Sequence, residues 1–301
     1  MAVVIQPGFT PHVPPPPGST LATEGGDTLV VEAGDAMLVD PGVAAPPLSH
    51  PRIGWRELKG AVSASSEATG FSAVFAAMPQ TYTAWRPTGT ALENWVITLP
   101  GPDAADYCGI GAHDLGTQRA TIAVEQWDGA AWQVVVSHTP PDDSAILFLF
   151  TRVASAQFRV VVTGAAAPPR IGNVRFGVVS PLPRKSTFAP ALPITEAEEL
   201  SYNVNMSATG EWLGRSVVSA GLRFSLTVDH MPETYAAGEW AQFRRYCNEG
   251  DATFYVAPKP QAYPAECGYA WPQSPVRAER RIPNKGVSRS ATLELAAYRR
   301  P

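Results

Sequence analysis

The chain has 301 residues, of which 45% are hydrophobic and 17% charged, and its formal net charge is −4. This balance gives no basic footprint, so we expect no nucleic-acid binding site, and no apolar run is long enough to predict a membrane-spanning helix. The 30 prolines and 25 glycines favour a β-rich chain with many turns over a helical bundle.

The cysteine content argues against a cysteine-based framework. Cys108, Cys247 and Cys267 are an odd number with no CxxC spacing. Their pattern indicates neither a set of disulfides nor a zinc site. We therefore expect buried free thiols and no cofactor.

Residues 1–50 are dominated by proline, glycine and alanine, including four consecutive prolines at 14–17. Such a segment is extended and cannot bury a core of its own. Two short strands are predicted within it, at 28–32 and 36–39. We expect an extended N-terminal arm that lies on another surface, with a neighbouring subunit as the natural candidate.

Residues 51–180 have the pattern of an antiparallel β-sandwich. Apolar runs bounded by Gly, Pro or Asp recur at intervals of about ten residues. Trp95, Ile97 and Leu99 alternate along one of them and are predicted to share a face. The predicted strands lie at 50–60, 82–87, 94–100, 145–150, 157–163 and 170–179, with a further pair inside 107–136.

The pair inside 107–136 is predicted to be a strand, a turn at Asp128-Gly129 and a second strand. A glycine-rich stretch, 109–116, comes just before it and contains His113 and Asp114. This stretch has the composition of a catalytic or binding loop, and equally that of a structural corner.

Residues 181–192 form a proline-rich connector, which marks a domain boundary before a unit at 193–301. In that unit we predict strands on both sides of one helix at 232–248, ended by Gly250. This order indicates a compact α+β unit with one helix against one sheet. The predicted strands are 202–206, 223–228, 253–257 and 290–298, with a turn in 210–216 and a proline-rich loop at 258–275.

Three interpretations compete for His113 and Asp114. Neighbouring residues on a strand point to opposite faces, so the two do not readily form a catalytic dyad, and no nucleophile motif surrounds Cys108. In the structural interpretation His113 satisfies loop backbone groups and Asp114 caps a turn. In the third they make a polar contact with a ligand or neighbour.

Trp127 and Asp128, at the tip of the predicted hairpin, have the chemistry of a sugar site. An aromatic ring stacks on the apolar side of a pyranose, and polar groups hold its hydroxyls. Core packing is the alternative for Trp127, and for Trp95 it is the favoured interpretation.

Other acidic and basic groups give weaker hypotheses. Asp103 and Asp106 offer hard oxygen ligands for calcium, or are ordinary turn aspartates. The carboxylate pairs, such as Asp142-Asp143, lie in turns, so a glycoside hydrolase is not favoured. The arginines near the C-terminus indicate ion pairs or subunit contacts: Arg244, Arg245, Arg277, Arg280, Arg281 and Arg289.

Residues 50–180 resemble the galactose-binding-like jelly roll of the coagulation-factor type C or discoidin superfamily. The similar segments lie between Trp85 and Gly177, with DYCGIGAHDLGTQRATIAVEQWDGAAW at their centre. They look most like versions in bacteriophage tail proteins, where His-Asn-Leu-Gly stands at the position of His113 to Gly116. The second half, with GRSVVSAGLRFSLTVDHMPETYAAGEWAQFRRYCNEGDATFYVAP, resembles the small sheet-plus-helix domains of phage distal-tail and minor-tail proteins.

The resemblance implies a non-enzymatic structural protein of a phage tail tip, found in the virion and made in the host bacterial cytoplasm. It implies a ring-like homo-oligomer that contacts other tail proteins, with an outward jelly roll that binds a host-surface glycan. The alternative hypothesis is a stand-alone carbohydrate-binding protein or an accessory module of a polysaccharide-degrading enzyme.

Overall fold

The computed structural model describes residues 2–9, 48–184, 193–250, 252–281 and 288–299. This part of the chain is mostly β, as predicted, and its strands form one hydrogen-bonded sheet. The strands are β1 (Ala2–Ile5), β2 (Arg52–Glu57), β3 (Ala61–Ala64), β4 (Leu92–His113), β5 (Thr121–Trp127), β6 (Trp132–His138), β7 (Ile146–Thr163), β8 (Ile171–Pro181), β9 (Glu198–Met206), β10 (Trp212–Pro232), β11 (Phe254–Ala257), β12 (Gly268–Pro272), β13 (Glu279–Arg281) and β14 (Ser288–Ala297). The helices are α1 (Glu233–Ala237) and α2 (Glu239–Glu249), with short 3-10 segments at Ala73–Ala77 and Ile194–Glu196.

Two long strands, β4 and β7, build the predicted sandwich. They pair with each other antiparallel on both sides of a register shift between Thr98 and Asp103. On one side of the shift the pair is extended by β3, β5 and β6, and on the other by β1 and β8. Each long strand therefore belongs to both layers, because an irregularity of this kind bends a strand without ending it.

The two layers enclose an apolar core. Trp95, Ile97 and Leu99 are buried on one face of β4, which confirms the predicted alternation. The indole N–H of Trp95 donates to the carbonyl of Ala73 at 2.8 Å, so the polar atom of this core side chain is satisfied. The opposite layer supplies Ile110, Phe148, Phe150, Val174 and Phe176.

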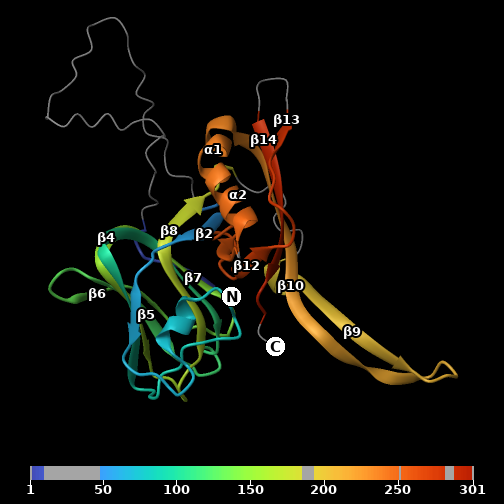
Figure 1. Cartoon of the computed structure of the whole chain (residues 1–301), viewed down its shortest axis with the longest axis horizontal. Coiled ribbons are helices and arrows are strands. Elements are labelled where there is room, and N and C mark those ends of the chain that lie inside the picture. The colour runs from blue at the N-terminus through green and yellow to red at the C-terminus, as the bar shows by residue number, and fades with distance from the viewer. Residues whose placement is uncertain (1, 10–47, 185–192, 251, 282–287, 300–301) are drawn as a thin grey trace, which may run out of the picture.

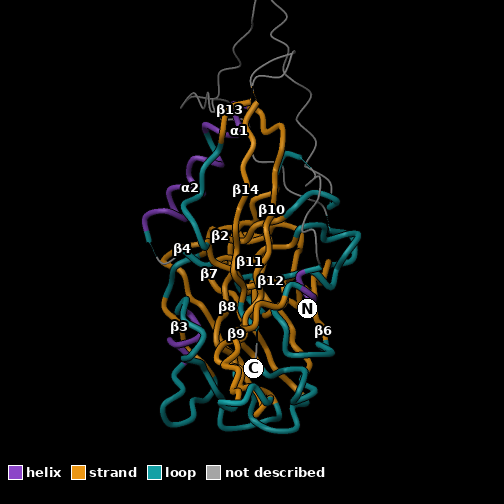
Figure 2. Tube along the Cα trace, turned by 90° about the vertical axis from the view of Figure 1, so that its right-hand side faces the viewer, coloured by secondary structure: helices purple, strands orange, loops and turns teal. Residues whose placement is uncertain are grey.

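The C-terminal part continues the same sheet. The short strand β2 pairs with β8 on one side and with β11 on the other. The order from there is β11, β12, β14, β10 and β9. Helices α1 and α2 lie against one face of this extension (Figures 1 and 2), as the sequence predicted. Trp240, Phe243 and Cys247 pack there on Phe224 and Leu293.

The sandwich and the C-terminal sheet meet at a third buried cluster. Tyr107 and Leu147 of the sandwich contact Tyr255 and Tyr269 of the C-terminal part there. All three cysteines are free and buried, as predicted. None of the helices in the described residues has the length and apolar character needed to cross a bilayer.

The prediction of one continuous helix is corrected at Gly238, where the structure has two helices. Gly238 has a non-helical backbone (φ −92°, ψ −96°) and separates α1 from α2. Glycine carries the largest helix penalty after proline, and the spacing of Trp240, Phe243 and Cys247 is satisfied by α2 alone. Gly250 follows α2, as predicted.

Several predicted strand boundaries also need correction. Residues 145–150 and 157–163 both fall in β7, and 94–100 joins 107–113 in β4, because pairing continues through the bends. The turn before 223–228 is shorter than predicted, since β10 already begins at Trp212. Strand β12 lies within the predicted loop 258–275, and residues 82–87 make only the bridge between Trp85 and Ile171. The predicted strands at 28–32 and 36–39 lie outside the described residues.

Candidate functional site

The tip of the β5–β6 hairpin is the first candidate. Trp127 and Trp132 are cross-strand partners at its end, and their half-buried rings meet edge to face with centroids 5.4 Å apart. Gly129 adopts φ +103° in the turn, a value that glycine accepts without strain. The tip therefore presents an aromatic pair on the surface.

Asp128 serves the turn itself. Its Oδ1 accepts from the backbone N–H groups of Ala130 and Ala131 at 2.8 and 2.7 Å, and its Oδ2 accepts from Gln133 at 2.7 Å. These bonds, led by those from Ala131 and Ala130, hold the pKa of Asp128 below its ordinary value. The carboxylate is exposed, yet its hydrogen bonds already define the hairpin.

A charged pair supports the same tip. The Arg159 guanidinium lies 4.2 Å from the ring centroid of Trp132 and forms an ion pair with Glu125 at 2.6 Å. Because Arg159 occupies this position, it covers part of the aromatic surface of Trp132. The tip is thus an exposed aromatic surface on which the ring of Trp132 is partly covered by Arg159.

His113 and Asp114 lie at a buried corner. Nδ1 of His113 accepts from the N–H of Leu115 at 3.3 Å, and burial lowers its pKa to about 4. Asp114 exchanges hydrogen bonds with the backbone of Arg170: its Oδ1 accepts at 2.5 Å and its N–H donates at 3.1 Å. Burial raises the pKa of Cys108, so no thiolate is available there for a nucleophilic step.

The structure does not bring the two predicted pairs together. β5 begins at Thr121, beside the corner, and runs away from it to Trp127. Six residues of strand separate these ends by about 20 Å. Trp127-Asp128 and His113-Asp114 are therefore separate features and do not form one site.

Asp103 and Asp106, the aspartates considered for calcium, make other contacts in the structure. Oδ2 of Asp106 accepts from Arg152 at 2.9 Å, and its Oδ1 accepts from the N–H of Val179 at 2.6 Å. Asp103 is exposed and bonds to the N–H of Ala104. Within the described ranges, no group of three or more His, Cys, Asp or Glu side chains is placed to hold a metal ion.

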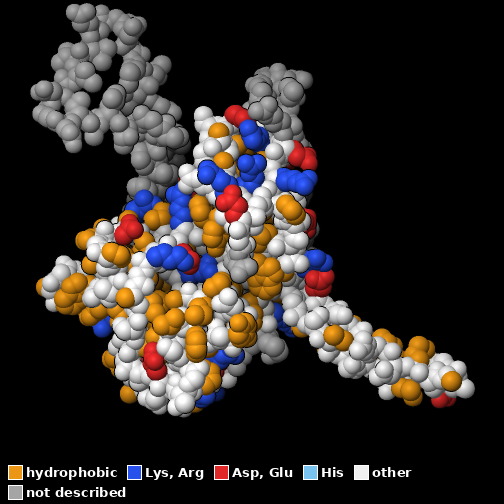
Figure 3. All heavy atoms as spheres, viewed as in Figure 1, with side chains coloured by type: hydrophobic (Ala, Val, Ile, Leu, Met, Phe, Trp, Pro, Cys, Tyr) orange, Lys and Arg blue, Asp and Glu red, His pale blue; other side chains and the backbone are white. Residues whose placement is uncertain are grey.

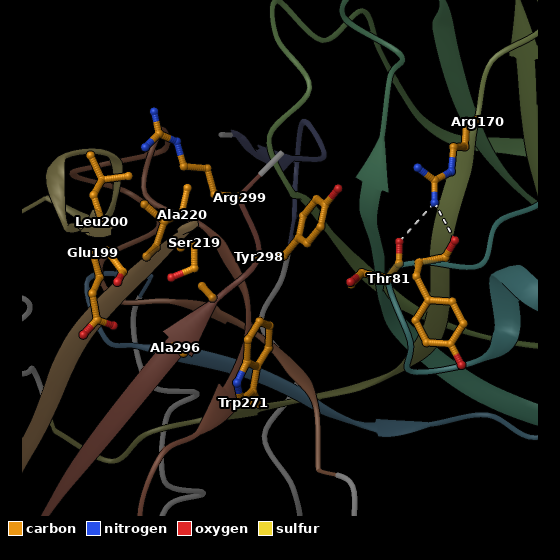
Figure 4. Close-up of a pocket in the computed structure, with 15 residues that line it drawn as sticks. Thr81, Arg170, Glu199, Leu200, Ser219, Ala220, Trp271, Ala296, Tyr298 and Arg299 are labelled. Atoms are coloured by element: carbon orange, nitrogen blue, oxygen red, sulfur yellow. Dashed lines mark hydrogen bonds between the residues drawn. The ribbon is translucent and has the colours of Figure 1, made fainter. Parts of the chain in front are cut away.

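A cleft of about 940 Å³ lies between the sandwich and the C-terminal sheet. Thr81, Tyr82 and Arg170 line it from the sandwich, and Trp271 and Tyr298 from the C-terminal sheet. Figure 4 shows Trp271 and Tyr298 facing Arg170 and Thr81 across the open space. Tyr82 is 79% exposed. Three aromatic residues, Tyr82, Trp271 and Tyr298, therefore line one hollow.

Charged and hydroxyl groups complete the lining of the cleft. Arg170 donates to the carbonyls of Thr81 and Tyr82 at 3.2 and 2.8 Å, which fixes the loop that carries Tyr82. Arg299 pairs with Glu198 at 2.8 Å. The remaining polar lining comes from Glu199, Ser201 and Ser219. Aromatic surfaces with a few fixed polar groups are typical of small-molecule and sugar sites.

No sequence pattern predicted this cleft. Its aromatic residues come from a segment predicted as a strand, from a proline-rich loop, and from the end of β14. Nearly 200 residues separate Tyr82 from Trp271. The continuation of the sheet through β2 into β11, β12 and β14 brings them to one hollow.

No family model matches the chain, and no curated protein matches it. Among solved structures it is similar to chitosan-binding module 1 of a chitosanase/glucanase from Paenibacillus sp. IK-5, with 18% identity, TM-score 0.36, and coverage of 41% of this chain and 99% of that one.

Two other solved structures are similar to the same extent. A pectin-binding carbohydrate-binding module has 17% identity and TM-score 0.35, over 40% of this chain and 91% of that one. A GH29 fucosidase from Ruminococcus gnavus, in complex with fucose, has 15% identity and TM-score 0.34, over 40% of this chain and 25% of that one. At these values the similarity identifies no ligand, so we base the functional proposal on the side chains of this chain.

Proposed function

We propose that this chain binds carbohydrate without turning it over, and that the ligand lies in the cleft between the sandwich and the C-terminal sheet. The observation that carries the proposal is that Tyr82, Trp271 and Tyr298 line one cleft together with charged groups of both signs. Pyranose rings have apolar faces and a rim of hydroxyls. Aromatic rings and planar charged groups complement these two parts.

The cleft suits this ligand class better than the hairpin tip. At the tip, Arg159 covers part of Trp132, and the Asp128 carboxylate is committed to the turn. In the cleft the charged groups are also paired, Glu199 with Arg223 and Arg299 with Glu198, but the lining offers three aromatic residues, of which Tyr82 is 79% exposed. Sugar binding at the hairpin tip stays a prediction, and the binding experiment described next distinguishes it from binding in the cleft.

Binding of the full chain to an array of glycans, followed by calorimetry on those retained, tests the proposal. We expect Trp271→Ala to weaken binding at least tenfold, with Tyr263→Ala, an exposed aromatic outside the cleft, as the control. Loss on Trp127→Ala with Trp271→Ala unaffected would move the site to the tip. Absence of binding to every glycan, or hydrolysis of the bound one, would contradict the proposal.

The second candidate function is structural: a component of a bacteriophage tail tip that assembles into a ring-like homo-oligomer. One observation favours assembly, namely the β-ribbon formed by β9 and β10, which projects from the body with apolar side chains exposed (Figure 1). Light scattering separates this candidate from a stand-alone binding protein. A monomer at high protein concentration would count against it.

A further inference from the structure

Strands β9 and β10 leave the body of the protein as a two-stranded ribbon. Their pairing runs from Leu222 opposite Glu198, at the body, to Trp212 opposite Met206, at the tip. The other neighbour of β10, β14, ends at Ala297, opposite Leu222. Beyond that point, the described residues give β10 only β9 as a partner.

The paired residues of the ribbon form one mostly apolar and one polar face; Leu213 and Val218, also exposed, lie at the two register shifts between these pairs. Along β9 the residues alternate strictly, and Leu200, Tyr202, Val204 and Met206 share one face. Their cross-strand partners on β10 share the same face, and most of them are apolar: Ala220, Val217, Arg215 and Trp212. The opposite face carries Glu199, Ser201, Asn203 and Asn205, paired with Gly221, Ser219, Ser216 and Gly214.

No described residue outside the ribbon buries the outer part of its apolar face. Val204, Met206, Trp212 and Val217 are between 53% and 60% exposed. Figure 3 shows orange side chains along the projecting ribbon with few blue or red ones between them. Together these side chains present apolar surface on the order of several hundred Å², a size that marks an interaction site on a soluble protein.

The same face of β10 is covered where the strand runs through the body. Leu222, Phe224 and Leu226 continue the row of Ala220 inward and are buried against Trp240 and Phe243 of α2. The ribbon therefore extends a core-facing surface beyond the helix that covers it. A two-stranded ribbon is marginally stable by itself. We therefore expect a covering layer on the apolar face of β9–β10.

The low charge of the β9–β10 ribbon indicates what kind of surface would cover its apolar face. Between Leu200 and Gly221 the only charged residues are Glu211, at the tip, and Arg215, whose guanidinium stacks 4.2 Å from the ring centroid of Tyr202. A membrane surface is recognised by clusters of Lys and Arg, which the ribbon lacks. A charged partner would need complementary charges, which it also lacks. An identical, nearly neutral apolar face is complementary to itself.

We propose that the apolar face of β9–β10 packs on the same face of a second copy of this chain, as two sheets pack face to face. The inference rests on the self-association proposed above and assigns it a surface. The same face on both copies makes a two-fold pair, so a ring would need a second contact elsewhere on the chain. Two ribbons would bury about 1,000 Å² in total, the lower limit for a specific interface. The contact is therefore reversible and depends on concentration.

Light scattering and sedimentation of the full chain over a range of concentrations test the proposal. We expect the mass to rise from the 32.1 kDa of one chain to at least twice that value. Val217→Glu puts a carboxylate on the apolar face and should raise the dissociation constant at least tenfold. Ser216→Glu, the adjacent exposed residue on the polar face, is the matched control and should leave it unchanged. Trp212→Ala is a second apolar-face variant without an added charge.

The outcomes separate this inference from the assembly function. An oligomer that is insensitive to Val217→Glu and Trp212→Ala would overturn the assigned face and leave assembly standing. A wild-type monomer at the highest concentration would overturn both, and binding of that monomer to anionic vesicles would assign the face to a membrane. Equal weakening by Val217→Glu and Ser216→Glu would also count against the assigned face.

Discussion

The ring of Tyr255 in β11 lies directly against Gly109 in β4. A Cβ atom at residue 109 would come within 2.3 Å of two carbons of that ring. The contact joins the sandwich to the C-terminal sheet, since the two residues belong to these two parts of the chain. Close packing at this point therefore requires a residue without a side chain.

We expect Gly109→Ala to destabilise the protein by about 1–3 kcal/mol, because the added methyl group must displace a fully buried ring. The measurement is urea-induced unfolding followed by tryptophan fluorescence. Gly101→Ala, also in β4 but with no atom within 4 Å of the added Cβ, is the control. Equal effects of the two substitutions would refute the packing argument.

Arg175 is a buried cation at the same junction. It forms an ion pair with Glu57 at 3.2 Å and donates to Tyr269 at 3.2 Å and to Thr253. Arg175→Met would remove the hydrogen bonds of this buried guanidinium to Tyr269 and Thr253, while Glu57 would keep its ion pair with Lys59. We therefore expect a loss of about 1–3 kcal/mol in the free energy of unfolding.

The exposed pair of Arg223 and Glu199 provides the contrast for Arg175. Their side chains are 49% and 55% exposed, so Arg223→Met should cost less than about 1 kcal/mol. Denaturant titration of both variants gives the comparison. A cost for Arg175→Met no larger than that for Arg223→Met would contradict the assigned role of the buried cation.

His113 predicts a pH dependence of stability. Burial lowers the pKa of its imidazole from 6.5 to about 4 in the folded protein. Between these values the unfolded chain binds a proton that the folded one does not, so stability is complete above pH 6.5 and falls as the pH drops toward 4. In His113→Asn we expect this part of the slope to vanish, as thermal unfolding between pH 4 and 7 would show. An unchanged slope would assign it to other groups.

Asp128 predicts a local effect at the hairpin tip. Asp128→Ala removes the acceptor for the N–H groups of Ala130 and Ala131, so we expect these amides to exchange faster with solvent. Asp128→Asn keeps an acceptor oxygen and should preserve most of the protection. The depressed pKa of Asp128 adds stability above the ordinary carboxyl pKa, which is lost as the pH falls through the folded value. Hydrogen exchange of Ala130 and Ala131 in the two variants measures the loss of protection, and the same measurement on the wild type over a range of pH measures the contribution of the Asp128 carboxylate.

The sequence alone determined the local elements whose pattern is periodic. The alternation of Trp95, Ile97 and Leu99 predicted a buried strand face, and the WDGAAW segment predicted the β5–β6 hairpin. The spacing of Trp240, Phe243 and Cys247 predicted the helix that covers the C-terminal sheet. These signals are readable because each depends on residues that are close in the chain.

Tertiary structure alone decided the rest. The cleft combines Tyr82 with Trp271, and the junction combines Gly109 with Tyr255, through a sheet that continues across β2. No local sequence pattern predicts which distant strands become neighbours in the sheet. The alternation of β9 was present in the sequence, yet only the exposure of each residue shows that the described part of the chain leaves its apolar face open. A pattern predicts which side chains share a face, and packing decides what that face meets.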